Sequence, residues 1–538
     1  MLSSILTVAA LVLSGSDFAD AALLHGALLS GTAQIADGVI QGNPPDTNGV
    51  VSFKGIPFAA PPVGDLRWRS PQPPTPWDDI LNATTFGDSC WGAPGLNRGV
   101  PQNEDCLKIN VWTPAKATED RLPVMFWIYG GGFQYGNSAN PEWDGAVLAT
   151  KGVIVVTFNY RTSTLGFLSL PDLDKEGQPS GNYGLQDMIS ALKWVRTNID
   201  KFGGDPSRVT IWGESAGAHA VGLLRSSPLT NGLFAGAIYE SGAFWDWEYG
   251  SLMTATQASA QGRVLQASLG VTSAEAMRQI SPDKLVSALP YDPTSSKPTL
   301  FGPSIDSYVL PRPPAAVFAS GQQVNVPLLA GVNLNEEYIF QPEIFPTNSP
   351  QHFRNTAALW FGNSALPEFN SIYPSGSDSE TTTSANRLLG DMTIRQQTWE
   401  AAAAQARLSP NVFFYHYNYN SSYSPIPIHT AEIPFVFGTL TPNPLSSVPP
   451  GPGDRMFSEQ LQSYWANFAK FGNPNGAGCR TGLPHWPSYT GDAKNIQQLE
   501  SPISVGTYNL DGFQFLKSFR VDGLFPQNWH NLNVSAVP

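Results

Sequence analysis

The stretch Arg208-Val-Thr-Ile-Trp-Gly-Glu-Ser-Ala-Gly-Ala-His-Ala-Val-Gly-Leu-Leu224 decides the fold of this chain. It predicts a β-branched strand, an abrupt turn at Gly213-Glu-Ser-Ala-Gly217, and then an apolar helix. A serine on such a turn is held clear of the backbone, so its hydroxyl can act as a nucleophile. The two glycines leave room where strand and helix nearly touch. The pentapeptide alone also fits an ordinary glycine turn, but the flanking strand and helix favour Ser215 as a nucleophile.

The regions around this turn alternate between apolar strands and helices. Continuous apolar runs, typical of strands buried on both faces, occur at residues 124–129 and 153–158. Helical periodicity follows from Leu185 to about Phe202. Further strands are predicted at 237–239, 326–330 and 412–417, and further helices at 350–410 and 455–471. This alternation predicts an α/β fold with a central, mostly parallel sheet and helices on both faces.

The chain of 538 residues shows no linker long enough to separate independent domains. Residues from about 250 to 325 combine short helices with proline-broken loops, and we expect them to form an insertion above the sheet. Residues 22–538 are therefore predicted to form a single domain. The net charge of −13 argues against a nucleic-acid partner, because few positive charges are available to neutralise phosphates.

The N-terminus predicts export. Met1 to Leu13 is an apolar run too short to span a bilayer, and Ala19-Asp-Ala21 offers a cleavage site, so residues 1–21 are predicted to be a signal peptide. An uncleaved anchor or a buried N-terminal segment is the alternative, because a basic leading segment is missing. Glycosylation sequons at Asn82, Asn420 and Asn533 support a secreted protein. We expect no membrane span in the mature chain.

The chain has three cysteines. Cys90 and Cys106 lie close in sequence, and an exported protein permits a disulfide between them. Cys479 has no His or Cys near it at metal-ligand spacing, so we interpret it as a free thiol. No metal site and no cofactor are predicted.

A nucleophilic serine needs a base, and the base needs an orienting carboxylate. In folds with this strand-to-helix turn, the chain order is Ser, then acid, then His, which excludes only His25. His429 is favoured because it follows Pro425-Ile-Pro-Ile428 in a stiff loop just after a strand, and His485 comes next. A structural role is the alternative for either loop histidine. The other histidines are less well placed, on helices, in a strand or near the chain end: His219, His352, His416 and His530.

The candidate acids are Glu336 and Glu337, which follow the strand at 326–330 through the turn at 331–335. A carboxylate there reaches the carboxyl edge of the sheet, where active sites of open α/β sheets lie. Two solvated surface glutamates are the alternative. Backbone N–H donors for an oxyanion are predicted in Gly130-Gly131-Gly132 and at Ala216, although the glycines also fit a flexible turn.

Several long motifs, in this order along the chain, resemble the type B carboxylesterase (cholinesterase-like) family of α/β-hydrolases. They are Phe53-Lys-Gly-Ile-Pro-Phe-Ala-Ala-Pro-Pro-Val-Gly64, Glu104-Asp-Cys-Leu107, Tyr129-Gly-Gly-Gly-Phe133, Gly181-Asn-Tyr-Gly-Leu-Gln-Asp187, Phe202-Gly-Gly-Asp-Pro206, Gly213-Glu-Ser-Ala-Gly217, Glu240-Ser-Gly242, Gly331-Val-Asn333 and His429 to Gly438.

The resemblance implies the α/β-hydrolase fold and a Ser-Glu-His triad. By this resemblance, Ser215 is the nucleophile, Glu336 the acid and His429 the base. The same comparison gives the oxyanion-hole amides to Gly131, Gly132 and Ala216, and it matches Cys90–Cys106 with the family's first disulfide.

The chain also departs from the family pattern. Glu337 stands where the family has Gly after the acid. The loop between Cys90 and Cys106 is shorter than the lid of the family's fungal lipases, which disfavours an interfacially activated lipase. No choline-binding Trp is supported in that loop, since Leu96 and Asn97 lie nearer the equivalent position than Trp91. The family builds its acyl pocket after Ser241, where this chain has three aromatic residues that fit a narrow pocket or core packing: Phe244, Trp245 and Trp247.

These observations predict a secreted serine carboxylesterase that hydrolyses a small-molecule ester through an acyl-enzyme on Ser215. Two alternatives keep the chemistry: an acyltransferase acting on a natural product, and a lipase-like enzyme acting on longer acyl esters. A non-catalytic binding protein of the same fold is a remote alternative, because all three triad positions carry the required residue types.

Overall fold

The computed structural model describes residues 31–93, 97, 99–244, 252–289, 301–339, 349–440, 442–477 and 482–519. Several predictions fall outside these residues: the signal peptide at 1–21, the sequon at Asn533, the free thiol of Cys479, and the positions of Leu96, Trp245, Trp247 and His530.

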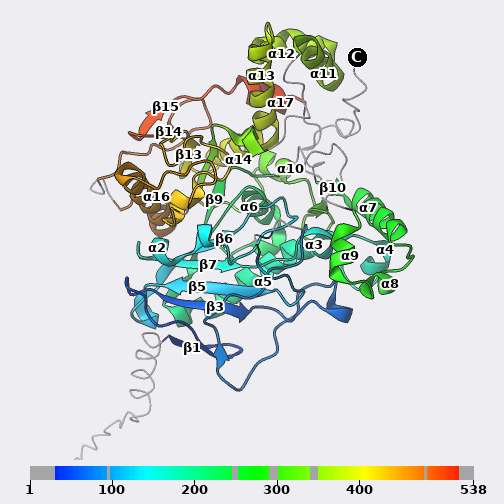
Figure 1. Cartoon of the computed structure of the whole chain (residues 1–538), viewed down its shortest axis with the longest axis vertical. Helices are drawn as coiled ribbons and strands as arrows, with labels where there is room; N and C mark the ends of the chain where they lie inside the picture. Colours follow the sequence, from blue (N-terminus) through cyan, green and yellow to red (C-terminus); the bar gives the residue numbers. More distant parts are fainter. Residues whose placement is uncertain are drawn as a thin grey trace, which may run out of the picture.

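A ten-stranded sheet forms the centre of the molecule, in the order β15-β14-β13-β12-β9-β8-β6-β7-β5-β3 (Figure 1). Neighbouring strands from β14 to β7 pair in parallel, whereas β15, β5 and β3 pair antiparallel at the two ends. The predicted mostly parallel sheet is therefore confirmed. Its strands are β3 (Val51–Pro57), β5 (Lys108–Thr113), β6 (Leu122–Ile128), β7 (Ile154–Phe158), β8 (Gly204–Glu214), β9 (Gly236–Glu240), β12 (Leu328–Asn333), β13 (Val412–Tyr417), β14 (Ile496–Leu499) and β15 (Ser504–Gly506).

The inner strands are buried on both faces, as their uninterrupted apolar sequences predict. Every residue of β7, β9, β12 and β13 is buried. Both ends of β12 differ from the predicted strand at 326–330: it runs from Leu328 to Asn333, so the expected turn at 331–335 begins later. Pairing with β13 on one side holds these extra residues in the sheet. The longer strand ends three residues before Glu336, so Glu336 and Glu337 lie close to the carboxyl edge of the sheet.

Helices cover both faces of the sheet. Trp212 of β8 stacks on Phe437 of α15 (Ile433–Phe437), with ring centroids 4.8 Å apart. The next residue, Gly213, approaches Gly217 of α6 (Ala216–Ser226). Because successive strand residues point to opposite faces, α15 and α6 lie on opposite sides of the sheet. Helix α16 (Pro452–Phe471) packs with α15, and α10 (Pro314–Ala319) contacts both α6 and α14 (Gln396–Ala406).

Two groups of helices extend beyond this central unit (Figure 1). Short helices α7 (Ala255–Ser268), α8 (Ala274–Arg278) and α9 (Pro282–Ser287) occupy part of the predicted insertion. Helices α11 (Pro350–Phe361), α12 (Leu366–Ile372), α13 (Asp378–Gly390) and α17 (Asp511–Lys517) surround a small separate core. No helix in the described part of the chain is both long and apolar enough to cross a membrane.

Candidate active site

The strand-to-helix turn places Ser215 in a strained backbone conformation, with φ 55° and ψ −127° between β8 and α6. A non-glycine residue reaches this region only when its surroundings hold it there. A Cβ on Gly217 would lie 1.9 Å from the carbonyl oxygen of Ile128, and one on Gly213 would lie 2.5 Å from the same atom. The Cβ on Gly213 would also lie 2.6 Å from the carbonyl carbon of Gly217, so the predicted close approach of strand and helix is confirmed.

Hydrogen bonds on both sides hold Ser215 in this position. Its N–H donates to the carbonyl of Glu240 at 2.9 Å, and its carbonyl accepts from the N–H of His219 at 2.9 Å. Ser215 is partly exposed, whereas Glu214 and Ala216 on either side of it are buried. The turn therefore presents this one residue while its neighbours fix the backbone.

The loop that carries His429 and the loop that carries Glu336 are hydrogen-bonded to each other at the edge of the sheet. The N–H of Asn335 donates to the carbonyl of Pro427 at 3.0 Å, and the side chain of Asn333 donates to the carbonyl of Ile428 at 2.8 Å. His429 Nδ1 then lies 2.6 Å from Glu336 Oε2, and both side chains are buried. The other oxygen of Glu336 accepts from the N–H of Asn333 at 2.6 Å.

The two candidate acids have different partners. Glu336 contacts His429, whereas Glu337 forms an ion pair with Arg395 at 2.8 Å. The alternative of two solvated surface glutamates is wrong, because the side chains of Glu336 and Glu337 are 0% and 11% exposed. Of the two residues, only Glu336 is placed to orient an imidazole.

A second carboxylate faces the other side of the His429 ring. His429 Nε2 lies 3.0 Å from Oε1 of Glu214, the residue directly before Ser215. Burial acts to lower the pKa of His429, but the carboxylates of Glu214 and Glu336 outweigh it and raise that pKa to about 9. Burial also raises the pKa of the Glu214 carboxyl well above its ordinary value, while the charge of His429 opposes this.

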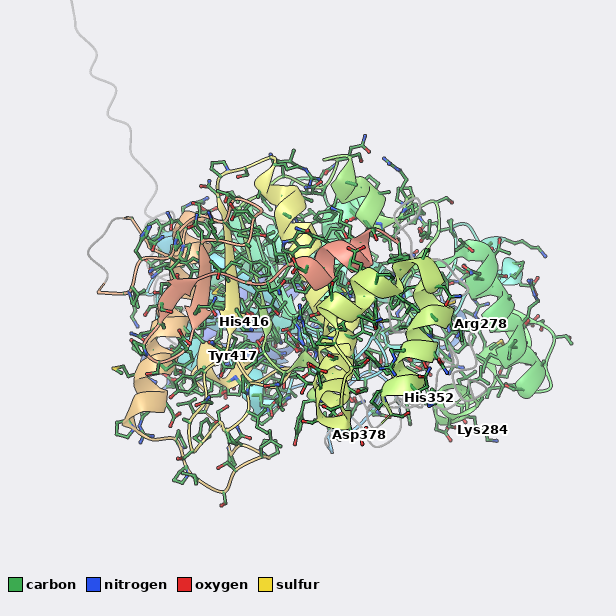
Figure 2. The ribbon with its side chains drawn as sticks, turned by 90° about the horizontal axis from the view of Figure 1, so that it is seen from above. Arg278, Lys284, His352, Asp378, His416 and Tyr417 are labelled. Atoms are coloured by element: carbon green, nitrogen blue, oxygen red, sulfur yellow. A yellow bond between two sulfur atoms is a disulfide. The ribbon has the colours of Figure 1, made fainter. Side chains whose placement is uncertain are left out.

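The other described histidines lack this arrangement. Burial lowers the pKa of His219 to about 3, and its Nδ1 accepts from the N–H of Ala243 at 3.0 Å. Burial likewise lowers the pKa of His416 to about 4, and its Nδ1 lies 3.1 Å from Gln498 Oε1. His352 lies on α11, well to the side of His416 on β13 (Figure 2). His485, the second choice from sequence, is exposed.

The glycine turn after β6 lies directly beside Ser215. A Cβ on Gly130 would lie 3.0 Å from Ser215 Cβ and 2.8 Å from the carbonyl oxygen of Glu214. Gly131 and Gly132 have φ values of 107° and 60°, which favour glycine. The carbonyl of Gly131 accepts from the N–H of Gln134 at 2.9 Å, which closes the turn. Peptide groups of this turn and of the first turn of α6 therefore lie beside Ser215, where they could supply N–H donors for an oxyanion.

Residues 30–511 match the carboxylesterase family. The chain belongs to this family. It is 38% identical to a fumonisin B1 esterase of Sphingopyxis macrogoltabida over 455 residues, 82% of each chain. It is 35% identical to the para-nitrobenzyl esterase of Bacillus subtilis over 477 residues, 85% of this chain and 93% of the relative. It is 35% identical to the cholinesterase of Mus musculus over 499 residues, 85% of this chain and 80% of that protein.

Solved carboxylesterase structures have the same fold. A PNB esterase superposes with a TM-score of 0.78 at 32% identity, covering 90% of this chain and 100% of that one. A carboxylesterase of Geobacillus stearothermophilus gives 0.76 at 31% identity, with 90% and 99% covered. The α/β-hydrolase fold expected from sequence is confirmed, and the protein is a carboxylic ester hydrolase.

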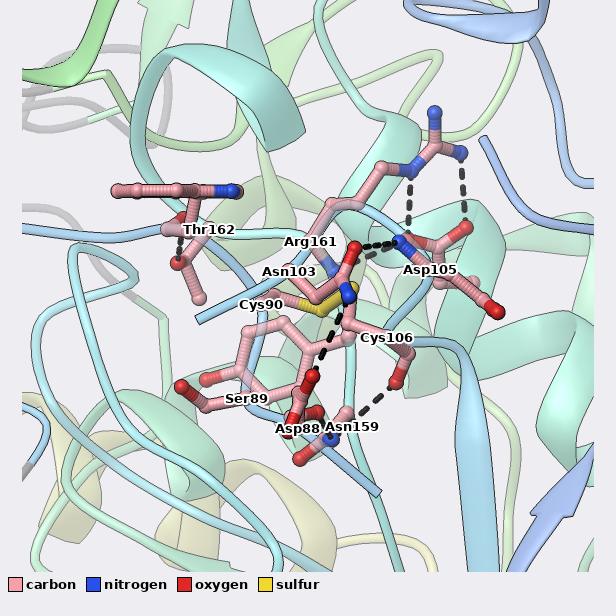
Figure 3. Close-up of a disulfide and its surroundings, with 12 residues drawn as sticks. Asp88, Ser89, Cys90, Asn103, Asp105, Cys106, Asn159, Arg161 and Thr162 are labelled. Carbon is pink, nitrogen blue, oxygen red and sulfur yellow. Dashed lines mark hydrogen bonds and ion pairs between the residues drawn. A yellow bond between two sulfur atoms is a disulfide. The ribbon is translucent and has the colours of Figure 1, made fainter. Parts of the chain in front are cut away.

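In this carboxylesterase, a disulfide joins Cys90 to Cys106 (Figure 3). The N–H of Ala93 donates to the carbonyl of Gln134 at 2.8 Å. Asn97 Oδ1 accepts from the N–H of Gly136 at 2.9 Å. Two hydrogen bonds, one between backbone groups and one to the Asn97 side chain, thus join the loop between these cysteines to the segment that follows the glycine turn.

Phe244, at the predicted acyl-pocket position, is completely buried. Its ring packs edge-on against Phe318, with centroids 4.9 Å apart, and its N–H donates to Gln397 Oε1 at 3.0 Å. This residue therefore packs in the core beside the Ser241 turn.

Sequence reasoning missed three carboxylesterase residues around His429. Glu214 belongs to the predicted turn Gly213–Gly217, but its contact with His429 is not predicted from the sequence. Glu432 accepts from Asn333 Nδ2 at 2.5 Å, and burial raises its pKa to about 7. Asn333 therefore bridges Glu336 and Glu432. The spacing of three residues between His429 and Glu432 was the available signal, because both residues lie in the short turn that precedes α15. The described residues contain no group of side chains arranged to hold a metal ion.

Proposed function

We propose that this carboxylesterase is a secreted serine esterase, with Ser215 as the nucleophile, His429 as the base, Glu336 as the orienting acid, and an acyl-enzyme as the intermediate. The observation that carries the proposal is the hydrogen bond between His429 and Glu336. It ties a buried imidazole to a carboxylate while the opposite ring nitrogen lies against the residue that precedes Ser215. A serine hydroxyl is activated when a histidine oriented in this way accepts its proton.

In the first half of the proposed reaction, Ser215 Oγ bonds to the ester carbonyl carbon and passes its proton to His429 Nε2. The carbonyl oxygen becomes an oxyanion, which the N–H groups of Gly131, Gly132 and Ala216 stabilise. The bond to the alcohol oxygen then breaks, and that oxygen takes the proton from His429. Glu336 stays ionised and stabilises the imidazolium through Nδ1–H.

The second half repeats these steps with water. Water gives a proton to His429 and bonds to the acyl carbon, and the bond to Ser215 Oγ breaks as the serine regains its proton. The acid product leaves, and the enzyme returns to its starting state. An alcohol that took the place of water would give an acyltransferase.

The test compares the purified protein with its Ser215→Ala variant on short p-nitrophenyl and p-nitrobenzyl esters. We expect kcat to fall by several orders of magnitude in the variant. Labelling by a fluorophosphonate should occur only where Ser215 is present. Equal rates in the two proteins, or no labelling of either, would contradict the proposal. Product analysis with added alcohols separates hydrolysis from acyl transfer.

A further inference from the structure

The buried guanidinium of Arg395 lies next to the acid loop, residues 334–337, which carries Glu336. Arg395 is the last residue of the π-helical turn η9 (Asp391–Arg395), which joins α13 to α14, and its side chain is 4% exposed. Arg395 Nη2 donates to Glu337 Oε2 at 2.8 Å, and Arg395 Nε donates to Asp391 Oδ1 at 3.2 Å. A single cation thus links a helical turn to the loop that carries Glu336. π-Helical turns are often found at functional sites.

Arg395 holds the acid loop at two points. Besides Glu337, it donates from Nη1 to the carbonyl of Leu334 at 3.4 Å. These contacts lie two residues before and one residue after Glu336. On the opposite side, the N–H of Asn335 is bonded to the histidine loop. The backbone around Glu336 is therefore held on one side by Arg395 of η9 and on the other side by the loop that carries His429.

Further residues fix the position of Arg395 itself. Asp391 accepts from the hydroxyl of Tyr373 at 2.9 Å. A Cβ on Gly390 would lie 2.3 Å from Arg395 Nη2, and one on Gly512 would lie 2.4 Å from the Tyr373 hydroxyl oxygen. Glycine at both positions leaves the room that this arrangement needs. The ionic network is therefore built from several segments far apart in the chain.

We propose that Arg395 and Glu337 form a positioning pair for the catalytic acid, which holds the Glu336 carboxylate at hydrogen-bond distance from His429. The inference rests on the proposed function, because it assigns a role relative to the Ser215–His429–Glu336 triad. Misplacing a catalytic group by about 1 Å can reduce turnover about a hundredfold. A charge-assisted bond to the residue next to Glu336 is a direct means of preventing that displacement.

The test measures kcat and KM for Glu337→Gln, Arg395→Met, Arg395→Lys and the double variant Glu337→Gln/Arg395→Met. The matched control is Glu400→Gln, a buried glutamate of α14 that bonds to Gln396 Nε2 at 2.8 Å. Turnover is expressed per folded molecule, counted from the amplitude of the thermal unfolding transition. A loss of folded protein then does not lower the measured kcat.

We expect kcat of Glu337→Gln to fall about tenfold or more, with KM changed less than about threefold, because the pair orients the acid and does not bind substrate. The single and double variants should be non-additive in kcat, since both remove one interaction. Arg395→Lys keeps the charge with fewer donors and should retain more activity than Arg395→Met. Glu400→Gln should keep the wild-type kcat.

Wild-type kcat per folded molecule in Glu337→Gln, or independent effects of the two substitutions, would overturn the inference. Arg395→Lys and Glu337→Gln are mild changes, so a failure of Arg395→Met to fold does not remove the test. A Ser215→Ala variant that keeps full activity would instead overturn the proposed function, and the two failures are therefore distinguishable.

Discussion

Ser215 has a backbone conformation that its own side chain does not favour, and adjoining glycines make that conformation possible. Gly217 lies against the carbonyl of Ile128, so neither strand β6 nor helix α6 could keep its place if a side chain were added. The packing around the turn offsets the free-energy cost of the strained backbone at Ser215.

We expect Gly217→Ala to destabilise the protein by about 2 kcal/mol or more, because the new Cβ would overlap backbone atoms. Thermal unfolding measures the loss. Gly453→Ala is the matched control: it lies in the first turn of α16, and a Cβ there meets no atom within 4 Å, so this variant should lose no stability. A Gly217→Ala variant as stable as the control would contradict the proposed close contact.

His429 is held between two buried carboxylates, one on each ring nitrogen. Both stabilise the imidazolium, so the neutral form of His429, the proposed base, is present only at a higher pH than for an ordinary histidine. The acidic limb of the kcat/KM profile should therefore lie above the usual histidine pKa of about 6.5.

Glu214→Gln should move this acidic limb to lower pH by about one unit. The charge of the imidazolium favours ionisation of Glu214 against the effect of burial, so Glu214→Gln removes a carboxylate that stabilises the imidazolium from 3.0 Å. The pKa of His429 then falls, and its neutral form is present at lower pH. The measurement is kcat/KM against pH, with Glu400→Gln as the control. An unchanged or upward-shifted limb in Glu214→Gln would show that Glu214 does not carry a negative charge in the free enzyme.

Among the structural elements, the disulfide loop is hydrogen-bonded to the segment that follows the glycine turn. Buried Cys90 and Cys106 close the loop, and Asn97 and Ala93 bond it to the segment after Gly132. The disulfide limits the freedom of the unfolded chain. It also limits the movement of residues that lie beside Ser215.

Cys90→Ser/Cys106→Ser should lower the free energy of unfolding by about 3 kcal/mol, as expected for a loop of this length. Urea unfolding measures this change. We also expect kcat to fall by more than KM changes, because the glycine turn loses part of its support. Wild-type stability in the double variant, with the disulfide verified in the parent protein, would be inconsistent with this account.

For the molecule as a whole, export is a proposal. It rests on the predicted signal peptide, on the sequons and on the exposure of two sequon asparagines. Asn82 and Asn420 are both exposed, so either side chain is accessible to a glycosyltransferase. Asn533 and the predicted signal peptide lie outside the described residues.

When the chain is expressed through a eukaryotic secretory pathway, the exported protein should begin at residue 22. It should lose mass on endoglycosidase treatment. Asn82→Gln and Asn420→Gln should each remove one glycan, and mass spectrometry measures both effects. Protein that is retained in the cell with Met1 intact would argue against export.

The sequence patterns that predict structure correctly in this protein are local or periodic. The turn around Ser215, the glycine run and the apolar strands depend on neighbours within a few residues, and β13 has the predicted bounds. The sequence also limited the acid to Glu336 or Glu337 and favoured His429 over His485. Those choices followed from chain order and from the position of each residue relative to a strand.

Only the tertiary structure decided which of these side chains meet. The hydrogen bond between Glu336 and His429 joins residues 93 positions apart, and adjacent Glu337 turns instead to Arg395. The contact of Glu214 with His429 is equally non-local. Sequence periodicity indicates which face of a strand or helix is buried. It does not determine which buried side chain lies within 3 Å of another, because packing between distant elements sets those distances.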